Sequence, residues 1–209
     1  MAALHLVVLL ALVWAFLALV RLYAGVKGYG KRDLYARPAG DPAQGVRYAF
    51  TWAMAPWAKE SVRMNLLSYL AGMAFHAGVG SGLVLLVLDL LGVALPTALL
   101  PAVRALTLAG AAGGFGLFMK RLFVPRLRGL SVLDDYLSNL LTSLFVLLAF
   151  DWTFRPELEA LWLGEAVVLL AYLPLGKIRH CLFFFPTRYH LGAFFGRRGT
   201  FPPGGSFHA

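Results

Sequence analysis

The sequence holds a single cysteine, Cys181, and few charged residues. One cysteine excludes an intramolecular disulfide and a cysteine-ligated metal cluster. Asp, Glu, Lys and Arg make up 14% of the 209 residues, whereas a soluble domain carries about 25%. Segments in which apolar and polar residues alternate are also lacking, which argues against a β-barrel. These absences exclude an ordinary soluble fold and a disulfide-stabilised one.

Long apolar runs take the place of the missing charges, since 60% of the residues are hydrophobic. Runs of this length are typical of helices that face lipid. We expect an all-α membrane protein, a bundle of five transmembrane helices over residues 2–20, 66–91, 99–119, 133–152 and 158–185. The chain then divides into a membrane domain over residues 1–185 and a C-terminal tail over residues 186–209.

The fifth run is the longest, and we expect one continuous helix that ends at Pro186. At about 1.5 Å per residue this helix is roughly 42 Å long, so it should project beyond the hydrocarbon. The polar stretch between the first two runs contains TWAMAPWAKE, in which Trp52 and Trp57 are typical of a helix lying at the membrane interface.

Basic residues gather on one side of the predicted membrane. The first run has no lysine or arginine before it and is followed by Arg21 and Lys27, which indicates an uncleaved anchor with its N-terminus outside. Residues 21–63, 119–135 and 177–209 then hold eight, four and five of the 19 lysines and arginines. This bias places the C-terminus inside. We therefore interpret the net charge of +9 as a topology signal and not as a sign of nucleic-acid binding.

His76 lies about ten residues into the second run, in MAFHAGVGSG. A histidine at that depth is costly unless its ring is satisfied, so it either crosslinks helices or serves a function. Gly72 and Gly80 lie four residues before and after His76 and share its helix face. They leave room for a flat macrocycle, although small residues also let helices approach, as we expect of Gly78 and Gly82 on another face.

His180, in PLGKIRHCLFFFP, is the candidate partner of His76, because the two runs are antiparallel and both histidines fall in the inner half. Two neutral imidazoles on two helices are the ligand set of a bis-histidine haem iron. Lys177 and Arg179 either pair with the haem propionates or anchor the inner surface as ordinary basic residues. His190, further along the chain, is the alternative to His180 as a ligand.

Other charged residues within or beside the runs also have two interpretations. Glu165 lies inside the fifth run and Arg104 near the outer end of the third, so they either contact a quinone or pair with each other. Asp134 and Asp135 begin the fourth run, where negative charge suits a helix N-terminus.

Three motifs occur in the order and spacing of a known family: FHAG around His76, RLRGLSVLDDYLSNL at residues 126–140 and PLGKIRH at residues 174–180. Over residues 1–185 the chain resembles the gamma, or cytochrome b, subunit of respiratory nitrate reductase and its relatives. These relatives include membrane subunits of heterodisulfide-reductase-like and sulfite-reductase-associated complexes. The plan of five spans with an outer N-terminus is also similar.

The resemblance implies a membrane cytochrome b subunit of a respiratory oxidoreductase complex, located in the inner (cytoplasmic) membrane of a prokaryote. Such a subunit passes electrons between membrane quinol and an iron–sulfur subunit on the inner face, in complexes that can include a further catalytic subunit. It is not catalytic alone. The matched positions imply that His76 and His180 ligate a haem b between the second and fifth helices.

The nitrate reductase subunit has a second, outer haem with its own histidine pair, whereas the corresponding positions here fall near Leu86 and Trp162. We therefore expect one haem b, with quinone or quinol as substrate and membrane lipid around the bundle. The direction of electron flow stays open between quinol oxidation and quinone reduction. The alternative is a haem-free membrane anchor or assembly scaffold, whose histidines only crosslink helices.

Overall fold

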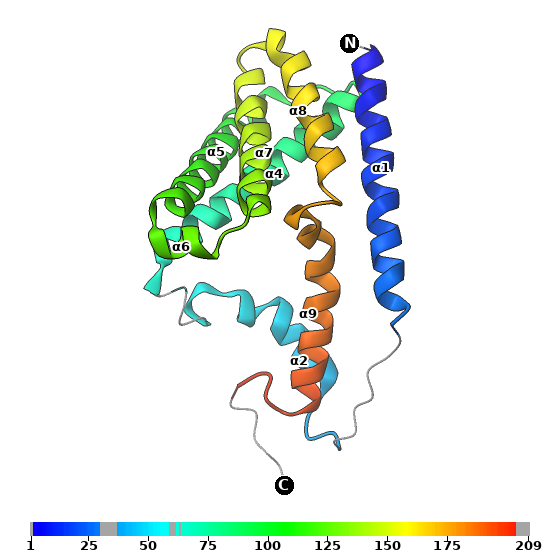
Figure 1. The fold of residues 1–209 in the computed structure, drawn as a ribbon, viewed down its shortest axis with the longest axis vertical. Helices are drawn as coiled ribbons and strands as arrows, with labels where there is room; N and C mark the ends of the chain where they lie inside the picture. The colour runs from blue at the N-terminus through cyan, green and yellow to red at the C-terminus, as the bar shows by residue number, and fades with distance from the viewer. Residues whose placement is uncertain (1, 30–36, 59–61, 63, 204–209) are drawn as a thin grey trace. The chain divides into compact units, whose positions relative to one another are not determined.

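The computed structural model describes residues 2–29, 37–58, 62 and 64–203, and every regular element among them is helical. The α-helices are α1 (Ala2–Lys27), α2 (Pro42–Phe50), α4 (Leu66–Leu90), α5 (Leu100–Phe123), α6 (Pro125–Leu130), α7 (Leu133–Trp152), α8 (Glu159–Tyr172) and α9 (His180–Arg197) (Figure 1). Short 3₁₀ turns cover Trp52–Met54, Pro56–Ala58, Thr97–Leu99, Pro156–Leu158 and Lys177–Arg179. The expected all-α class is confirmed over these residues.

Four helical segments are long and apolar enough to cross a membrane, namely Ala2–Lys27, Leu66–Leu90, Thr97–Phe123 and Leu133–Trp152. They agree with the first four predicted runs. The main difference is that α1 continues past its apolar residues to Lys27, because helix formation requires backbone hydrogen bonds and not apolar side chains. It ends at Lys27, and the N–H of the following Gly28 donates to Ala24 O at 3.1 Å.

The fifth predicted span is not one helix, so the expectation of a continuous helix was wrong. α8 ends at Tyr172, and α9 begins only at His180. Pro174 has no N–H to donate to the preceding turn, which favours a break at this point. Gly176 then lies so close to the Tyr172 ring that a Cβ in its place would clash. The two helices can be counted together as one broken span, which would bring the number of spans to five.

The chain forms two compact units, and each is built from two segments. Unit 1 comprises residues 1–18 and 67–178, and unit 2 comprises residues 19–66 and 179–209. The predicted boundary at residue 185 separates a membrane domain from a tail. It stays a prediction, because the compactness of a unit does not report where a membrane lies.

The core of unit 1 is built on stacked aromatic rings. Phe145 and Trp162 have no exposed surface, and their ring centroids lie 6.1 Å apart. Trp152 stacks on the same Trp162 ring at 4.4 Å. α7 contacts both α5 and α8 (Figure 1). α1 is tied to α8 where Trp14 Nε1 donates to Ala171 O at 3.1 Å.

Glycines let α4 and α5 approach closely within unit 1. A Cβ on Gly78 would lie 2.6 Å from Gly110 Cα on α5. Gly82 makes a similar approach to α7, where its Cβ would lie 2.9 Å from the Phe145 ring. Gly78 and Gly82 are both buried, so their expected place on a packing face is confirmed. Small residues are effective here because lipid supplies no hydrophobic drive for two helices to associate, and close backbone approach gives van der Waals contact instead.

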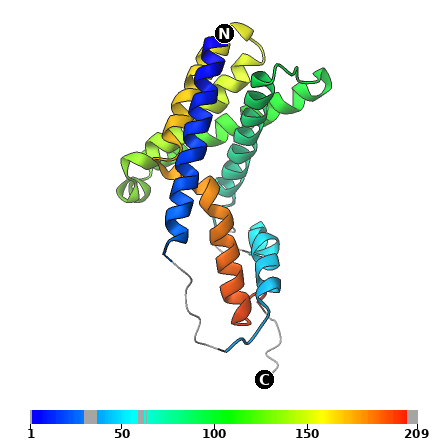
Figure 2. The ribbon, with the colours of Figure 1, turned by 90° about the vertical axis from the view of Figure 1, so that its right-hand side faces the viewer.

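Unit 2 is a close pair of helices, α2 and α9, which lie side by side in both views (Figure 2). A Cβ on Gly45 would overlap the backbone of Gly192 and Gly196, and Ala49 is fully buried. α9 continues through Pro186, so the expectation that Pro186 ends a helix was wrong. An internal proline costs about 3 kcal/mol, and the packing of α9 on α2 offsets this cost.

The segment TWAMAPWAKE does not form the interfacial α-helix that the sequence predicts. α2 ends at Phe50, where Thr51 Oγ1 donates to Arg47 O at 2.8 Å, and two short 3₁₀ turns follow. Trp52 and Trp57 are 63% and 60% exposed, and their rings make an edge contact with centroids 6.1 Å apart. The last two residues of the segment lie outside the described part of the chain.

The α4–α5 contact gives a stability prediction. We expect Gly110→Ala to destabilise the purified protein by about 1–3 kcal/mol, because the new Cβ would lie 2.6 Å from Gly78 Cα. Gly116→Ala is the matched control on the same helix, since a Cβ at Gly116 meets no atom within 4 Å. Thermal unfolding in detergent measures both, and equal melting temperatures would contradict this account of the helix contact.

Candidate functional site

His76 lies near the middle of α4, on an exposed face of unit 1. Its Nδ1 atom lies 2.7 Å from Gly72 O, one helical turn earlier. A carbonyl oxygen only accepts hydrogen bonds, so Nδ1 carries the proton and donates it. In the neutral ring Nε2 then holds the lone pair with which an imidazole binds a metal. A backbone partner on the other ring nitrogen is the usual way in which a protein orients a metal-binding histidine.

Open space surrounds the two glycines that share the face of His76. A Cβ placed on Gly72 or on Gly80 would meet no atom within 4 Å. These glycines therefore differ from Gly78, which is pressed against α5. The Phe75 ring makes an edge contact with the imidazole, with centroids 6.1 Å apart. At these two glycines the face of α4 that carries His76 is thus not covered by neighbouring atoms.

The two other candidate ligands belong to unit 2. His180 is the first residue of α9 and His190 lies ten residues further along the same helix, and both are exposed. Arg179 precedes His180 and is also exposed. His190 makes an edge contact with the Tyr189 ring at 5.5 Å. His76 belongs to unit 1, whereas His180 and His190 belong to unit 2, and each histidine is described within its own unit.

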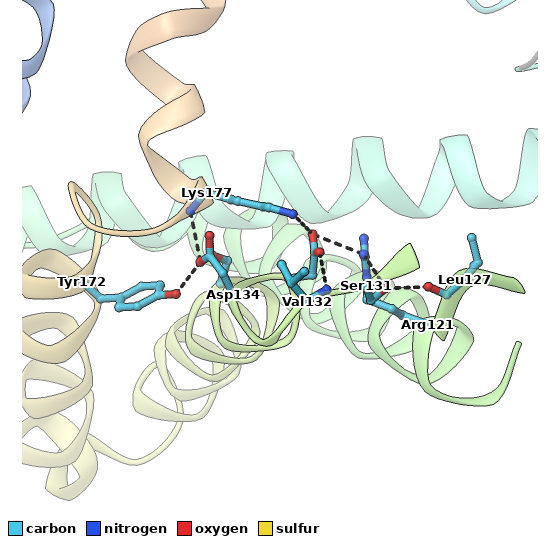
Figure 3. A network of polar contacts seen from close by, with 9 residues as sticks. Arg121, Leu127, Ser131, Val132, Asp134, Tyr172 and Lys177 are labelled. Carbon is cyan, nitrogen blue, oxygen red and sulfur yellow. Dashed lines mark hydrogen bonds and ion pairs between the residues drawn. The ribbon is translucent and has the colours of Figure 1, made fainter. Parts of the chain in front are cut away.

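Lys177 takes part in a network of polar contacts at the start of α7 (Figure 3). Its Nζ lies 2.7 Å from Asp135 Oδ1, and Arg121 Nη1 approaches the same oxygen to 3.3 Å. Asp135 Oδ2 accepts the Val132 backbone N–H at 3.0 Å, which caps the helix. The cap agrees with the prediction that negative charge belongs at this helix start. The Lys177 ammonium is therefore already paired with a carboxylate.

Asp134, the neighbouring carboxylate, joins the same network from the other side (Figure 3). Its Oδ1 accepts from Tyr172 Oη, from Ser138 Oγ at 2.9 Å and from the Lys177 backbone N–H at 3.2 Å. The network thus fastens the break after α8 to the start of α7. It also brings together two of the three motifs that the sequence singled out, residues 126–140 and 174–180.

Arg104 and Glu165 do not pair with each other, so this interpretation of the two residues was wrong. Arg104 Nε donates to Thr153 Oγ1 at 3.0 Å, and its guanidinium lies 3.7 Å from the centre of the Phe154 ring. In the described part of the chain, Glu165 Oε1 and Trp162 Nε1 are buried without a hydrogen-bond partner. The hydroxyl of Thr153 and the ring of Phe154, just after the end of α7, are the partners of Arg104. The sequence carried no signal for this pairing.

The sequence predicts that no second haem is held near Leu86 and Trp162, and both residues lie in the packed core of unit 1. Leu86 is 2% exposed and Trp162 is not exposed at all. The Trp162 ring is stacked with both Phe145 and Trp152.

Comparisons with known proteins add no relative. No protein-family model matches the chain, and neither the curated proteins nor the solved structures contain a match. The functional argument therefore depends on the residues of this chain.

Asp134 gives a prediction about the network in Figure 3. We expect Asp134→Ala to lower the stability of the purified protein by about 1–3 kcal/mol, because the substitution leaves three donors without their shared acceptor. Tyr172→Phe removes one of these donors and should have a smaller effect. Glu157→Ala, at an exposed acid, is the control. Melting temperatures in detergent test this order, and an unchanged value for Asp134→Ala would contradict it.

Proposed function

We propose that this protein is the membrane cytochrome b subunit of a respiratory oxidoreductase complex, with one haem b ligated by His76. The observation that carries the proposal is the geometry around His76. Its Nδ1 is committed to Gly72 O, and the glycine face beside it is open, on a helix long enough to cross a membrane. A histidine that only crosslinked helices would sit on a packed face, as Gly78 does.

The residues around His76 fit a haem ligand in both chemistry and space. The hydrogen bond to Gly72 O fixes the ring orientation and makes the imidazole a stronger donor through Nε2. Gly72 and Gly80 leave the adjacent surface free of side chains. When bound, the haem supplies reversible one-electron transfer, while the protein supplies ligands, burial and orientation.

The second ligand in the proposal is His180, and His190 is its alternative. Both lie on α9 and both are exposed. A bis-histidine site requires one further histidine besides His76. Of the two basic residues expected to meet the haem propionates, Arg179 is the stronger candidate. The reason is that Lys177 Nζ already lies 2.7 Å from Asp135 Oδ1. Lys177 would therefore have to share its charge between Asp135 and a propionate.

One haem per chain is the second part of the proposal. The resemblance places outer histidines near Leu86 and Trp162, which are both buried in this chain, and Trp162 is stacked on Trp152. Neither side chain offers iron a usual haem ligand.

In the proposed complex, electrons pass between membrane quinol or quinone and an iron–sulfur subunit on the inner face. The basic segments support this placement, because the predicted inner side carries most of the lysines and arginines. The membrane is the prokaryotic inner membrane in this proposal. The chain acts as the quinol-oxidising or quinone-reducing subunit and not as an enzyme alone.

Haem content tests the ligand assignment directly. We expect the wild-type chain to show a b-type reduced-minus-oxidised spectrum at one haem per chain, and His76→Ala and His180→Ala to lose it while still inserting into membranes. His190→Ala is the matched variant on α9 and should keep the haem. Loss in His190→Ala with retention in His180→Ala would move the second ligand to His190. A haem-free wild-type protein would instead support the scaffold alternative.

The open face of α4 gives an independent test. We expect Gly72→Phe to lower haem content at least tenfold, because the ring would fill the space beside His76. The fold should be unchanged, since a Cβ at Gly72 meets no atom within 4 Å. Gly164→Phe, at another glycine with open space, is the control and should keep full haem content. Equal haem in both variants, measured after the same purification, would contradict the proposed position of the cofactor.

A further inference from the structure

Three metal-ligating side chains from three helices meet at one end of unit 1. His5 lies near the start of α1, Asp89 near the end of α4 and Glu159 at the start of α8. His5 Nε2 is 3.0 Å from Asp89 Oδ2 and 3.7 Å from Glu159 Oε1. The N-terminus and the start of α8 lie at the same end of unit 1 in Figure 1. Sequence reasoning assigned no role to His5, because its partners are 84 and more residues away.

The distances between these ligand atoms suit a bound metal ion. One atom from each side chain lies within 4.8 Å of the others. Zn²⁺ binds nitrogen and oxygen at about 2.0–2.2 Å in a tetrahedron, which places pairs of ligand atoms about 3.3–3.6 Å apart. The two separations from His5 Nε2, 3.0 and 3.7 Å, bracket this range.

The charge of the cluster also favours a cation. Within the described residues, neither Asp89 nor Glu159 has a lysine or arginine partner, and both ion pairs are with His5. The side chains are 24%, 13% and 26% exposed for His5, Asp89 and Glu159, so they are only partly hydrated. Two partly buried carboxylates facing one imidazole leave negative charge that a divalent ion would neutralise.

His5 and Asp89 each stand alone in an apolar stretch of sequence. His5 is the only ionisable side chain from Ala2 to Val20, and Asp89 is the only acidic residue of α4. Each lies near the end of a largely apolar helix. Here two such residues contact each other and a third ligand.

We propose that His5, Asp89 and Glu159 form a binding site for a divalent transition-metal cation, with Zn²⁺ as the ion of best fit. One nitrogen and two carboxylate oxygens are ligands that Zn²⁺ accepts, and three protein ligands leave a fourth position. A hollow of about 270 Å³ adjoins one of the three ligands, Asp89, and is lined by Gly92 and Trp152 among others. In the orientation that the sequence predicts, the site faces the outside.

The ion would fasten the first helix to the bundle. α1 also packs on the core of unit 1 through the buried Val8 and the partly buried Ala11 and Leu12, and Trp14 donates a hydrogen bond to Ala171 O. A cation that binds His5 on α1, Asp89 on α4 and Glu159 on α8 would link three helices at once. This inference is independent of the haem proposal, since it uses none of the residues around His76.

Zinc titration of the full chain tests the site. The protein is purified with a tag that contains no histidine, treated with EDTA, and titrated with Zn²⁺ against a fluorescent zinc chelator. We expect one tight site per chain, and at least a tenfold weaker affinity in His5→Ala and in Asp89→Asn. Glu157→Gln, two residues from Glu159 and exposed, is the control and should bind like the wild type. Zinc should raise the melting temperature of the wild type and not that of His5→Ala.

A second variant guards against loss of binding through misfolding. His5→Cys keeps a metal ligand at the same place, so with Co²⁺ it should show a thiolate-to-metal charge-transfer band that the wild-type chain lacks. Such a band together with weakened binding in His5→Ala would support the site. Wild-type affinity in both His5→Ala and Asp89→Asn, or no zinc bound by the wild type, would overturn it.

Discussion

The close contact between Gly78 of α4 and Gly110 of α5 determines which face of α4 is buried in unit 1 and which face stays open. In lipid, helices gain little from burying apolar surface, so backbone approach through glycine holds them together. His76 is two residues before Gly78 and therefore faces almost the opposite side of α4. The glycine contact thus turns one face of the helix into the core and leaves the face with Gly72, His76 and Gly80 open. The proposed haem site depends on this division.

Two clusters of polar side chains in unit 1 lie at helix ends and join neighbouring helices. Asp134 and Asp135 tie the break after α8 to the start of α7, through Tyr172 and Lys177. A second cluster joins α1, α4 and α8 through His5, where an imidazole meets two carboxylates. The two clusters differ in charge balance. The first pairs two carboxylates with the cations Lys177 and Arg121, whereas in the second the carboxylates of Asp89 and Glu159 face one imidazole. The metal ion is therefore proposed for the second cluster.

Much of the helical plan follows from the sequence, because hydrocarbon solvent requires long apolar segments with internally satisfied backbones. The second and fourth runs match α4 and α7 within a residue at each end. The fifth run was misjudged, since apolar composition does not report the break that Pro174 and the packing of Gly176 introduce. Pro186 was expected to end a helix, but α9 continues through it. The contact of α9 with α2 outweighs the tendency of proline to break a helix.

The sequence by itself determined the class of the protein, the positions of its apolar helices and the unusual depth of His76. These features are local, since they depend on composition and on spacing along one helix. Only the tertiary structure decided which partners the polar residues find. It paired Lys177 with Asp135, Arg104 with Thr153 and His5 with Asp89 and Glu159. Such pairs join residues far apart in the chain, and their distances depend on how closely small residues let the helices pack.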